Sequence, residues 1–240
     1  MRLALALSAL ATAGLAAVGP AFPQATTQAT IRLSWDTCDP QRPDTVFAGP
    51  LSYRLVISVA NLTPGYWADD NVGTDLTLAI ASEDGAEVPD AWRFDEAGCQ
   101  TPIYYDCQPR ALSAECPAMV GPRPLKLTTY GYDPATRSCS LRMANTYDPF
   151  SPAPGQRYTL WQIWFDMQYA AAGAGIPGEI CGGAEKPIRI RLLSAEMCPV
   201  NGYIVTFHPT PGDRSYLHWR GDPPVPTASV TWGRVKGLYR

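Results

Sequence analysis

The chain has 240 residues, and its 19 basic and 22 acidic side chains give a formal net charge of −3. Nucleic acid is not an expected partner, because binding it requires clustered lysines and arginines that displace counterions from phosphates. The length fits one large domain or two small ones, so both remain open at this point.

The N-terminus has the features of a secretory signal peptide, which we assign to residues 1–21. An early arginine precedes an apolar stretch from Leu3 to Leu15, and small residues follow at positions that a signal peptidase can cut. Cleavage after Ala16 and cleavage after Ala21 fit equally well. No later stretch approaches the ~20 apolar residues that span a bilayer. We therefore expect no membrane insertion after cleavage and a mature protein that is secreted or periplasmic.

Short runs of alternating apolar and polar residues follow, which is the pattern of half-buried β-strands. In the first run, "TIRLSW", the residues Ile31, Leu33 and Trp35 share one face. Most prolines and glycines fall between the runs, as expected for turns. The sequence predicts an all-β fold, an immunoglobulin-like or jelly-roll-like β-sandwich with long disulfide-bearing loops. The later runs cover residues 51–59, 75–80, 125–130, 139–144, 157–169, 188–192, 203–207 and 216–219.

One sandwich is expected over residues 27–222. The stretch 98–124 interrupts the alternation and holds three cysteines, so it is either a linker between two small sandwiches or an elaborated loop. A loop is favoured, because the first half of the chain offers too few strands to close two sheets around a core. Residues 223–240 form a tail, in which "TWGRVKGLYR" predicts a short C-terminal helix with one apolar stripe.

Seven cysteines in an exported chain predict disulfides rather than reduced thiols. The count is odd, so one thiol is free or pairs between chains. We expect at least two intramolecular disulfides, with Cys181–Cys198 among them, because a single predicted strand separates the two residues. No C-x-x-C spacing is present and both histidines lie far from any cysteine pair, so neither zinc nor a cofactor is expected.

Motifs for catalysis and for metal binding are weak. The two histidines, His208 and His218, stand in no recognisable nucleophile motif, so we expect structural roles for both and assign no catalytic residue. In "DDNVGTD", Asp69, Asn71 and Asp75 have the alternate spacing of calcium ligands. Its glycine comes one position early and no glutamate closes the motif, so a polar turn is favoured. A glycosidase with two facing carboxylates remains an alternative, since 22 acidic residues do not exclude one.

The strand at 157–169 carries the sharpest candidate for a binding site. Its odd positions supply an apolar face, whereas its even positions place a tryptophan among polar side chains. If the next strand returns antiparallel beside it, two arginines join the same face. A ring among amide, carboxylate and guanidinium groups is typical of a sugar site. The candidate ligand-binding residues are Tyr158, Gln162, Trp164, Asp166, Arg189 and Arg191.

Two interpretations of Trp164 stay open at this stage. A ring of ~200 Å² left in water without a partner is unusual, so Trp164 is either covered by a loop or helix or exposed as a ligand or partner surface. The exposed case predicts a non-catalytic binding module for a polysaccharide or another surface protein. The covered case favours a structural or adhesive component of an envelope or extracellular assembly.

Three short segments, "IRLSWDTC", "CGGAEKPIRI" and "TWGRVKGLYR", resemble stretches of uncharacterised secreted proteins from environmental bacteria. The resemblance implies export and a shared β domain. It implies no activity.

Overall fold

The computed structural model describes residues 30–38, 44–45, 52–62, 70–96, 98–100, 107–120, 124–167, 181–200, 204–207 and 215–220. The predicted signal peptide and C-terminal helix, and also Asp69 and His208, lie outside these residues. Within them, the only helical element is a 3-10 turn, η1 (Asp90–Trp92). The strands are β1 (Thr30–Trp35), β2 (Asp44–Thr45), β3 (Ser52–Ala60), β4 (Asn71–Ser82), β5 (Cys107–Gln108), β6 (Leu125–Asp133), β7 (Ser138–Phe150), β8 (Tyr158–Asp166), β9 (Ile188–Pro199), β10 (Val205–Phe207) and β11 (Tyr216–Trp219).

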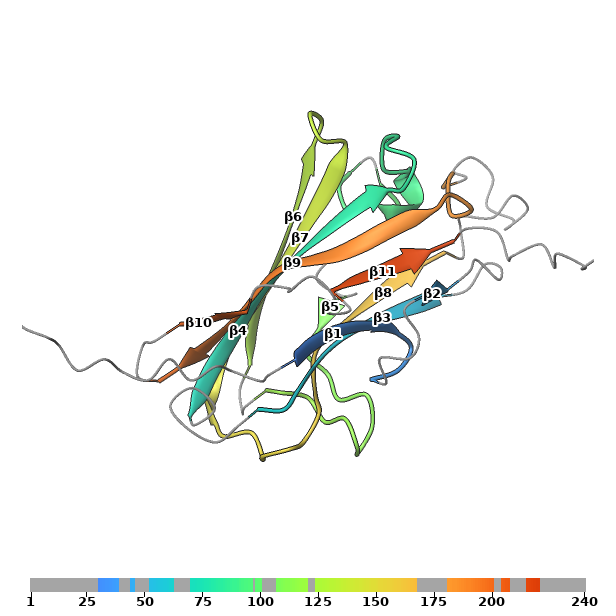
Figure 1. Cartoon of the computed structure of the whole chain (residues 1–240). Coiled ribbons are helices and arrows are strands. Elements are labelled where there is room, and N and C mark those ends of the chain that lie inside the picture. The colour runs from blue at the N-terminus through green and yellow to red at the C-terminus, as the bar shows by residue number, and fades with distance from the viewer. Residues whose placement is uncertain are drawn as a thin grey trace, which may run out of the picture.

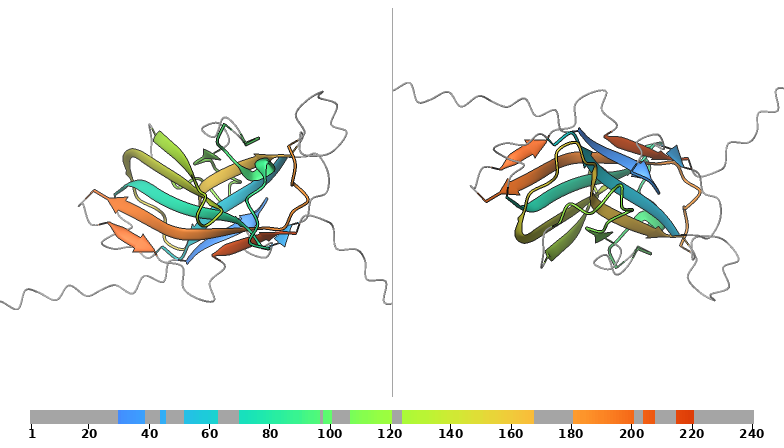
Figure 2. Two further views of the ribbon diagram at one scale, coloured as in Figure 1. Left: turned by 90° about the horizontal axis from the view of Figure 1, so that it is seen from above. Right: turned by 90° about the horizontal axis from the view of Figure 1, so that it is seen from below.

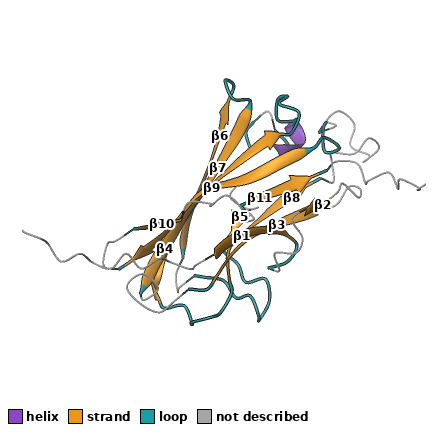
Figure 3. Cartoon of the chain, in the orientation of Figure 1, coloured by secondary structure: helices purple, strands orange, loops and turns teal. Residues whose placement is uncertain are grey.

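The strands form two sheets that pack against each other, as Figures 1 and 3 show, and Figure 2 gives the same two layers from above and below. Sheet A has the order β1-β3-β8-β5. Sheet B has the order β2-β11-β9-β4-β7-β6, and β10 pairs with β9. Both sheets combine strands from before and after residues 98–124. The fold is the all-β sandwich that the sequence predicts.

Alternation along each strand fills the space between the sheets with large side chains. Four aromatic rings contact one another in this core. The ring centroid of Trp35 lies 6.2 Å from that of Phe165 and 5.8 Å from that of Trp219. Trp92, from η1, lies 5.0 Å from Phe165 and 4.8 Å from Trp219. Because each ring buries 150–250 Å² of surface, as aromatic side chains generally do, this cluster contributes a large share of the hydrophobic stabilisation.

A β-bulge near the start of β8 changes the face on which its first residues lie. Ile57 of β3 lies opposite Trp161, whereas the next residue, Ser58, lies opposite Thr159. Leu160 is therefore the extra residue, and a bulge of one residue reverses the alternation beyond it.

Tyr158 consequently faces the core. Its side chain is buried and its ring lies 5.9 Å from that of Phe150. The sequence-based prediction that Tyr158 shares the outer face with Trp164 is wrong, because strict alternation takes no account of the bulge.

Two disulfides join distant parts of the described chain, Cys38–Cys116 and Cys99–Cys181. The predicted Cys181–Cys198 pair is wrong, since Cys181 bonds Cys99 and Cys198 is a free thiol. The reason is the length of β9. Cys198 stands near the far end of this extended strand, about 30 Å from its beginning at ~3.3 Å per residue. A disulfide tolerates no more than ~7 Å between Cα atoms.

Candidate functional site

One end of the outer face of sheet A leaves an aromatic ring and several charges open to solvent. Trp164 of β8 lies opposite Arg54 of β3, and Asp36, directly after β1, lies next to Arg54. The Asp36 N–H donates to the Arg54 carbonyl oxygen (2.8 Å), and Arg54 Nη2 donates to the Asp36 carbonyl oxygen (3.0 Å). These three residues form a row across neighbouring strands. Together with Ser52 and Asp166, which lie opposite each other in the next row, we call them the Trp164 surface.

Trp164 differs from the other tryptophans that the structure describes. Trp35, Trp92, Trp161 and Trp219 are exposed by no more than 1%, whereas Trp164 is only half-buried. Within the described part of the chain, its indole makes neither a hydrogen bond nor a ring contact. A partly solvated ring of this kind is available for stacking by a ligand.

Asp166 is held in place through its backbone. Its N–H donates to Gln100 Oε1 (2.8 Å), and its carbonyl oxygen accepts from Gln100 Nε2 (3.0 Å). Gln100 is fully buried and also donates to the Ala91 carbonyl oxygen (2.7 Å). This clamp fixes the end of β8 and with it the position of Trp164, two residues earlier.

Gln162 does not belong to the Trp164 surface, although the sequence places it on the same face. It is 1% exposed, and its Nε2 donates to the Arg110 carbonyl oxygen (3.0 Å). The segment 107–120 runs beside β8 here, where β5 pairs with it and the Cys38–Cys116 disulfide packs on Val56. Gln162 therefore holds this loop and is not available to a ligand.

Arg189 and Arg191 lie on the other sheet. The neighbours of β9 are β4, β10 and β11, while those of β8 are β3 and β5. The prediction that the two arginines stand beside Trp164 is therefore wrong. The alternating pattern correctly predicts that both arginine side chains face outward, since Ile188 and Ile190 face the core. It does not reveal that the chain changes sheets between β8 and β9.

The residues that replace the two arginines beside Trp164 are Arg54 and Asp36, which sequence reasoning missed. The sequence does indicate that the Arg54 side chain faces solvent, because Arg54 stands on the polar face of the alternating run at 51–59. Its proximity to Trp164 follows only from the pairing of β3 with β8.

The calcium candidate is not assembled among the described residues. Asn71 is fully buried, and its Oδ1 accepts from the Gly73 N–H (3.1 Å) and from the Tyr147 hydroxyl. Asp75 instead forms an ion pair with Arg142 on the outer face of sheet B. The favoured polar turn holds only in part, because Asn71 bonds the backbone two residues on, whereas Asp75 lies inside β4. The described part of the chain contains no cluster of three His, Cys, Asp or Glu side chains placed to hold a metal.

His218 joins the last strand to the turn after β4. Its Nδ1 contacts Glu83 Oε1, and its ring packs edge-on against Tyr216 with centroids 5.1 Å apart. The backbone carbonyl of His218 also accepts from Trp35 Nε1 (3.3 Å). These contacts give His218 a place in the packing of β11.

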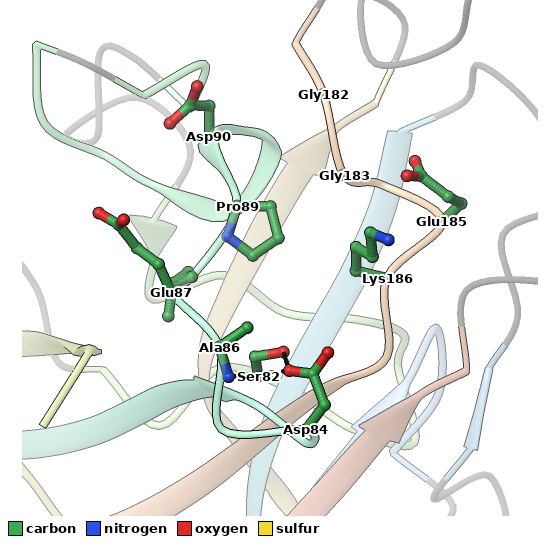
Figure 4. A pocket seen from close by; sticks show the side chains of 11 residues that line it. Ser82, Asp84, Ala86, Glu87, Pro89, Asp90, Gly182, Gly183, Glu185 and Lys186 are labelled. Atoms are coloured by element: carbon green, nitrogen blue, oxygen red, sulfur yellow. Dashed lines mark hydrogen bonds between the residues drawn. The ribbon is translucent and has the colours of Figure 1, made fainter.

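A pocket of about 420 Å³ lies between the turn after β4 and the segment that leads into β9 (Figure 4). In Figure 4, Glu87 and Asp90 project on one side of the pocket and Glu185 on the other. The Asp84 carboxylate accepts from Ser82 Oγ (2.6 Å) and from the Ala86 N–H (2.9 Å), and these bonds lower its pKa. The Asp84 carboxylate thus stabilises its own turn, while Glu87 and Asp90 lie 3.6 Å and 3.7 Å from the Arg93 guanidinium.

The part of the chain that the structure describes contains no helix that is long and apolar enough to cross a membrane. The two disulfides fit a protein of the periplasm or the extracellular space, where thiols oxidise.

No protein-family model matches the chain, and no curated protein matches it in sequence. Among solved structures, the chain is similar to a cohesin module from a family 33 glycoside hydrolase of Clostridium perfringens ATCC13124. The TM-score is 0.39 at 6% sequence identity, and the match covers 81% of this chain and 96% of that chain. At this level of similarity, no ligand and no residue role transfers to this chain.

Proposed function

We propose that this protein is an exported, non-catalytic binding module whose Trp164 surface binds carbohydrate. The observation that carries the proposal is the partly exposed Trp164 ring, which stands beside Arg54 on paired strands. A ring of this kind packs against the C–H face of a sugar, while neighbouring charged groups bond its hydroxyls. The predicted signal peptide and the two disulfides support export.

The row from Asp36 to Trp164 suits a short stretch of a polysaccharide. Neighbouring strands lie ~4.8 Å apart, so a row across three strands extends over about 10 Å. The strands also hold the side chains in place before a ligand arrives, which lowers the entropic cost of binding.

Arg54 and Asp36 engage each other, which favours binding over catalysis. Arg54 Nε lies 3.9 Å from the Asp36 carboxylate, and no histidine that the structure describes lies on this surface. The Arg54 guanidinium is a fork of N–H donors, which suits it to hold sugar hydroxyls in place.

Retention on insoluble neutral polysaccharides tests the proposal. Wild type is compared on cellulose, chitin, xylan and starch with two variants, Trp164→Ala and the control Tyr132→Ala. Tyr132 lies on β6 of the opposite sheet and is half-buried like Trp164, so the control also removes a partly exposed aromatic ring. We expect Trp164→Ala to lose retention and Tyr132→Ala to keep it. Equal retention of all three proteins would refute a role for Trp164, and no retention of wild type on any polymer would refute the ligand class.

A structural role in an assembly is the second candidate, and one observation favours it. Leu125 and Leu127 of β6 are 74% and 63% exposed, and β6 is the last strand of sheet B among the described residues. An apolar edge strand is a template for pairing with another chain. Sedimentation over a range of concentrations distinguishes the candidates, because an assembly component associates and a Leu125→Ser/Leu127→Ser variant does not.

A further inference from the structure

Two arginines stand side by side on the outer face of sheet B. Arg189 and Arg191 are both exposed and are two residues apart on β9, so their Cα atoms are about 6.7 Å apart in an extended strand. Throughout the part of the chain that the structure describes, neither side chain makes a hydrogen bond or an ion pair. Their two positive charges are therefore not neutralised by the protein.

The neighbouring strands place an aromatic wall on one side of the arginines. On β11, Tyr216 lies opposite Arg191 and His218 lies opposite Arg189. Tyr216 is 47% exposed, and its ring packs edge-on against that of His218. The contact fixes the orientation of the Tyr216 ring beside the arginines.

Small residues form the floor on the other side. The residue of β4 opposite Arg191 is Ala79, and the residue opposite Arg189 is Ala81. The same two rows continue into β7 at Ser140 and Ser138. No long side chain rises from these four positions, so a ligand can lie flat across β4 and β7 while it reaches both arginines.

The acidic side chains of this face have partners of their own. The Asp75 carboxylate is engaged by Arg142, and Glu83 by His218. Asp133, at the far end of the Arg189 row, accepts from the Ala135 N–H (2.9 Å) and from the Thr136 hydroxyl (2.8 Å). Farther along β9, the Glu196 carboxylate lies opposite Asp75 and contacts the Thr206 hydroxyl (3.5 Å). Beside the small-residue floor, the charges without a partner in the described part of the chain are the two arginines, in a chain whose net charge is −3.

We propose that this face, formed by Arg189, Arg191, Tyr216 and the small-residue floor of β4 and β7, is a second binding surface whose ligand is an anionic polysaccharide. Charge complementarity selects an anion, since guanidinium groups bond carboxylates and sulfates in a bidentate manner. A folded protein partner fits less well, because protein interfaces concentrate their energy in buried apolar anchors and the floor has none. Two arginines are also few for nucleic acid, whose binding depends on many phosphate contacts.

This surface is independent of the proposed Trp164 site. The two lie on the outer faces of different sheets, and no residue belongs to both. Each can therefore be present without the other, and a variant of one leaves the other intact.

Affinity electrophoresis in gels that contain polygalacturonate or dextran sulfate tests the proposal, with neutral dextran as the reference polymer. The test variant is Arg189→Gln/Arg191→Gln, and the control is Arg32→Gln/Arg110→Gln, which removes the same charge elsewhere. Arg32 is on β1 and Arg110 is in the loop beside β8. Thermal melting verifies that all variants are folded. We expect wild type to be retarded in at least one of the two charged gels and to migrate freely in dextran. The test variant should lose about tenfold or more in affinity, while the control and Trp164→Ala stay within about twofold.

Three results would overturn the proposal. If wild type migrates freely in both charged gels at low salt, an anionic polysaccharide is not the ligand of this surface. An equal loss in the test and control variants shows that only net charge matters. Tighter binding of single-stranded DNA than of either polysaccharide, with the same dependence on the two arginines, assigns the surface to nucleic acid instead. Loss of retention on neutral glycans by Trp164→Ala has no bearing on any of these results.

Discussion

Tyr158 and Trp164 lie on opposite faces of β8, although both occupy even positions of the same strand. The extra residue in the bulge, Leu160, turns Tyr158 into the core and leaves Trp164 at the surface. One strand thus supplies an aromatic ring to the interior and another to a candidate binding site.

Residues 164 and 165 should differ sharply in their contribution to stability. Phe165 is fully buried against Trp35 and Trp92, so Phe165→Ala should lower the free energy of unfolding by about 3–5 kcal/mol through the cavity it leaves. Trp164→Ala should change it by less than about 1 kcal/mol, as most surface substitutions do. Urea denaturation measures both values. A loss of similar size in the two variants would mean that Trp164 belongs to the core.

Removing either disulfide should destabilise the fold. The bridges close loops with sequence separations of 78 and 82 residues. A Cys99→Ala/Cys181→Ala variant should lose about 2–5 kcal/mol of unfolding free energy, because the unfolded chain regains the entropy of an open loop. Cys198→Ala serves as the control and should change little. Peptide mapping without reduction should recover Cys38–Cys116 and Cys99–Cys181, and a peptide that joins Cys181 to Cys198 would contradict the structure.

Calcium should leave the melting temperature unchanged. Asp75 is already neutralised by Arg142, and the side-chain oxygen of Asn71 accepts two hydrogen bonds in the interior. A ligand that binds the native state raises the melting temperature by mass action. Scanning calorimetry with millimolar CaCl₂ and with chelator should therefore give superimposable transitions, and a rise of several degrees with calcium would show a site.

Among the described residues, the free thiols of Cys139 and Cys198 should react with alkylating reagents at different rates. Cys139 is 1% exposed, and burial raises its pKa to about 11, while the Tyr130 hydroxyl lies 2.6 Å from its sulfur. At pH 8 only about one thousandth of this thiol is ionised, and the thiolate is the reactive form. Cys198 is half-buried and should be alkylated first, with mass spectrometry of the peptides as the measurement. Because folding raises the pKa of Cys139, the protonated thiol favours the folded state. This contribution to the free energy of unfolding is present below about pH 9 and is lost as the pH rises towards 11. Equal labelling of both thiols in the folded protein at pH 8 would contradict this assignment.

Period-two alternation predicts most of the strands, because it depends only on which residues enter the core. It correctly turns Ile188 and Ile190 inward and Arg189 and Arg191 outward. Alternation fails at Tyr158, where one extra residue reverses the faces.

Strand order and disulfide pairing depend on contacts between distant segments, so local patterns do not predict them. Arg54 and Trp164 are 110 positions apart in the sequence and become neighbours only because β3 pairs with β8. For the same reason local patterns do not identify Cys99 as the partner of Cys181. Closeness in sequence favours Cys198, but the length of β9 places Cys198 far from Cys181.

The two disulfides also bear on how the protein withstands proteases. The stretches that they bridge, 38–116 and 99–181, overlap. Every peptide bond between Cys38 and Cys181 is therefore spanned by at least one bridge, and a single cut anywhere in this region leaves both pieces covalently joined. Release of a fragment requires two cuts that enclose no bridged cysteine. A nicked molecule would keep its full mass on a gel without reductant and separate into pieces only after reduction, so a first proteolytic cut would not dismantle the sandwich.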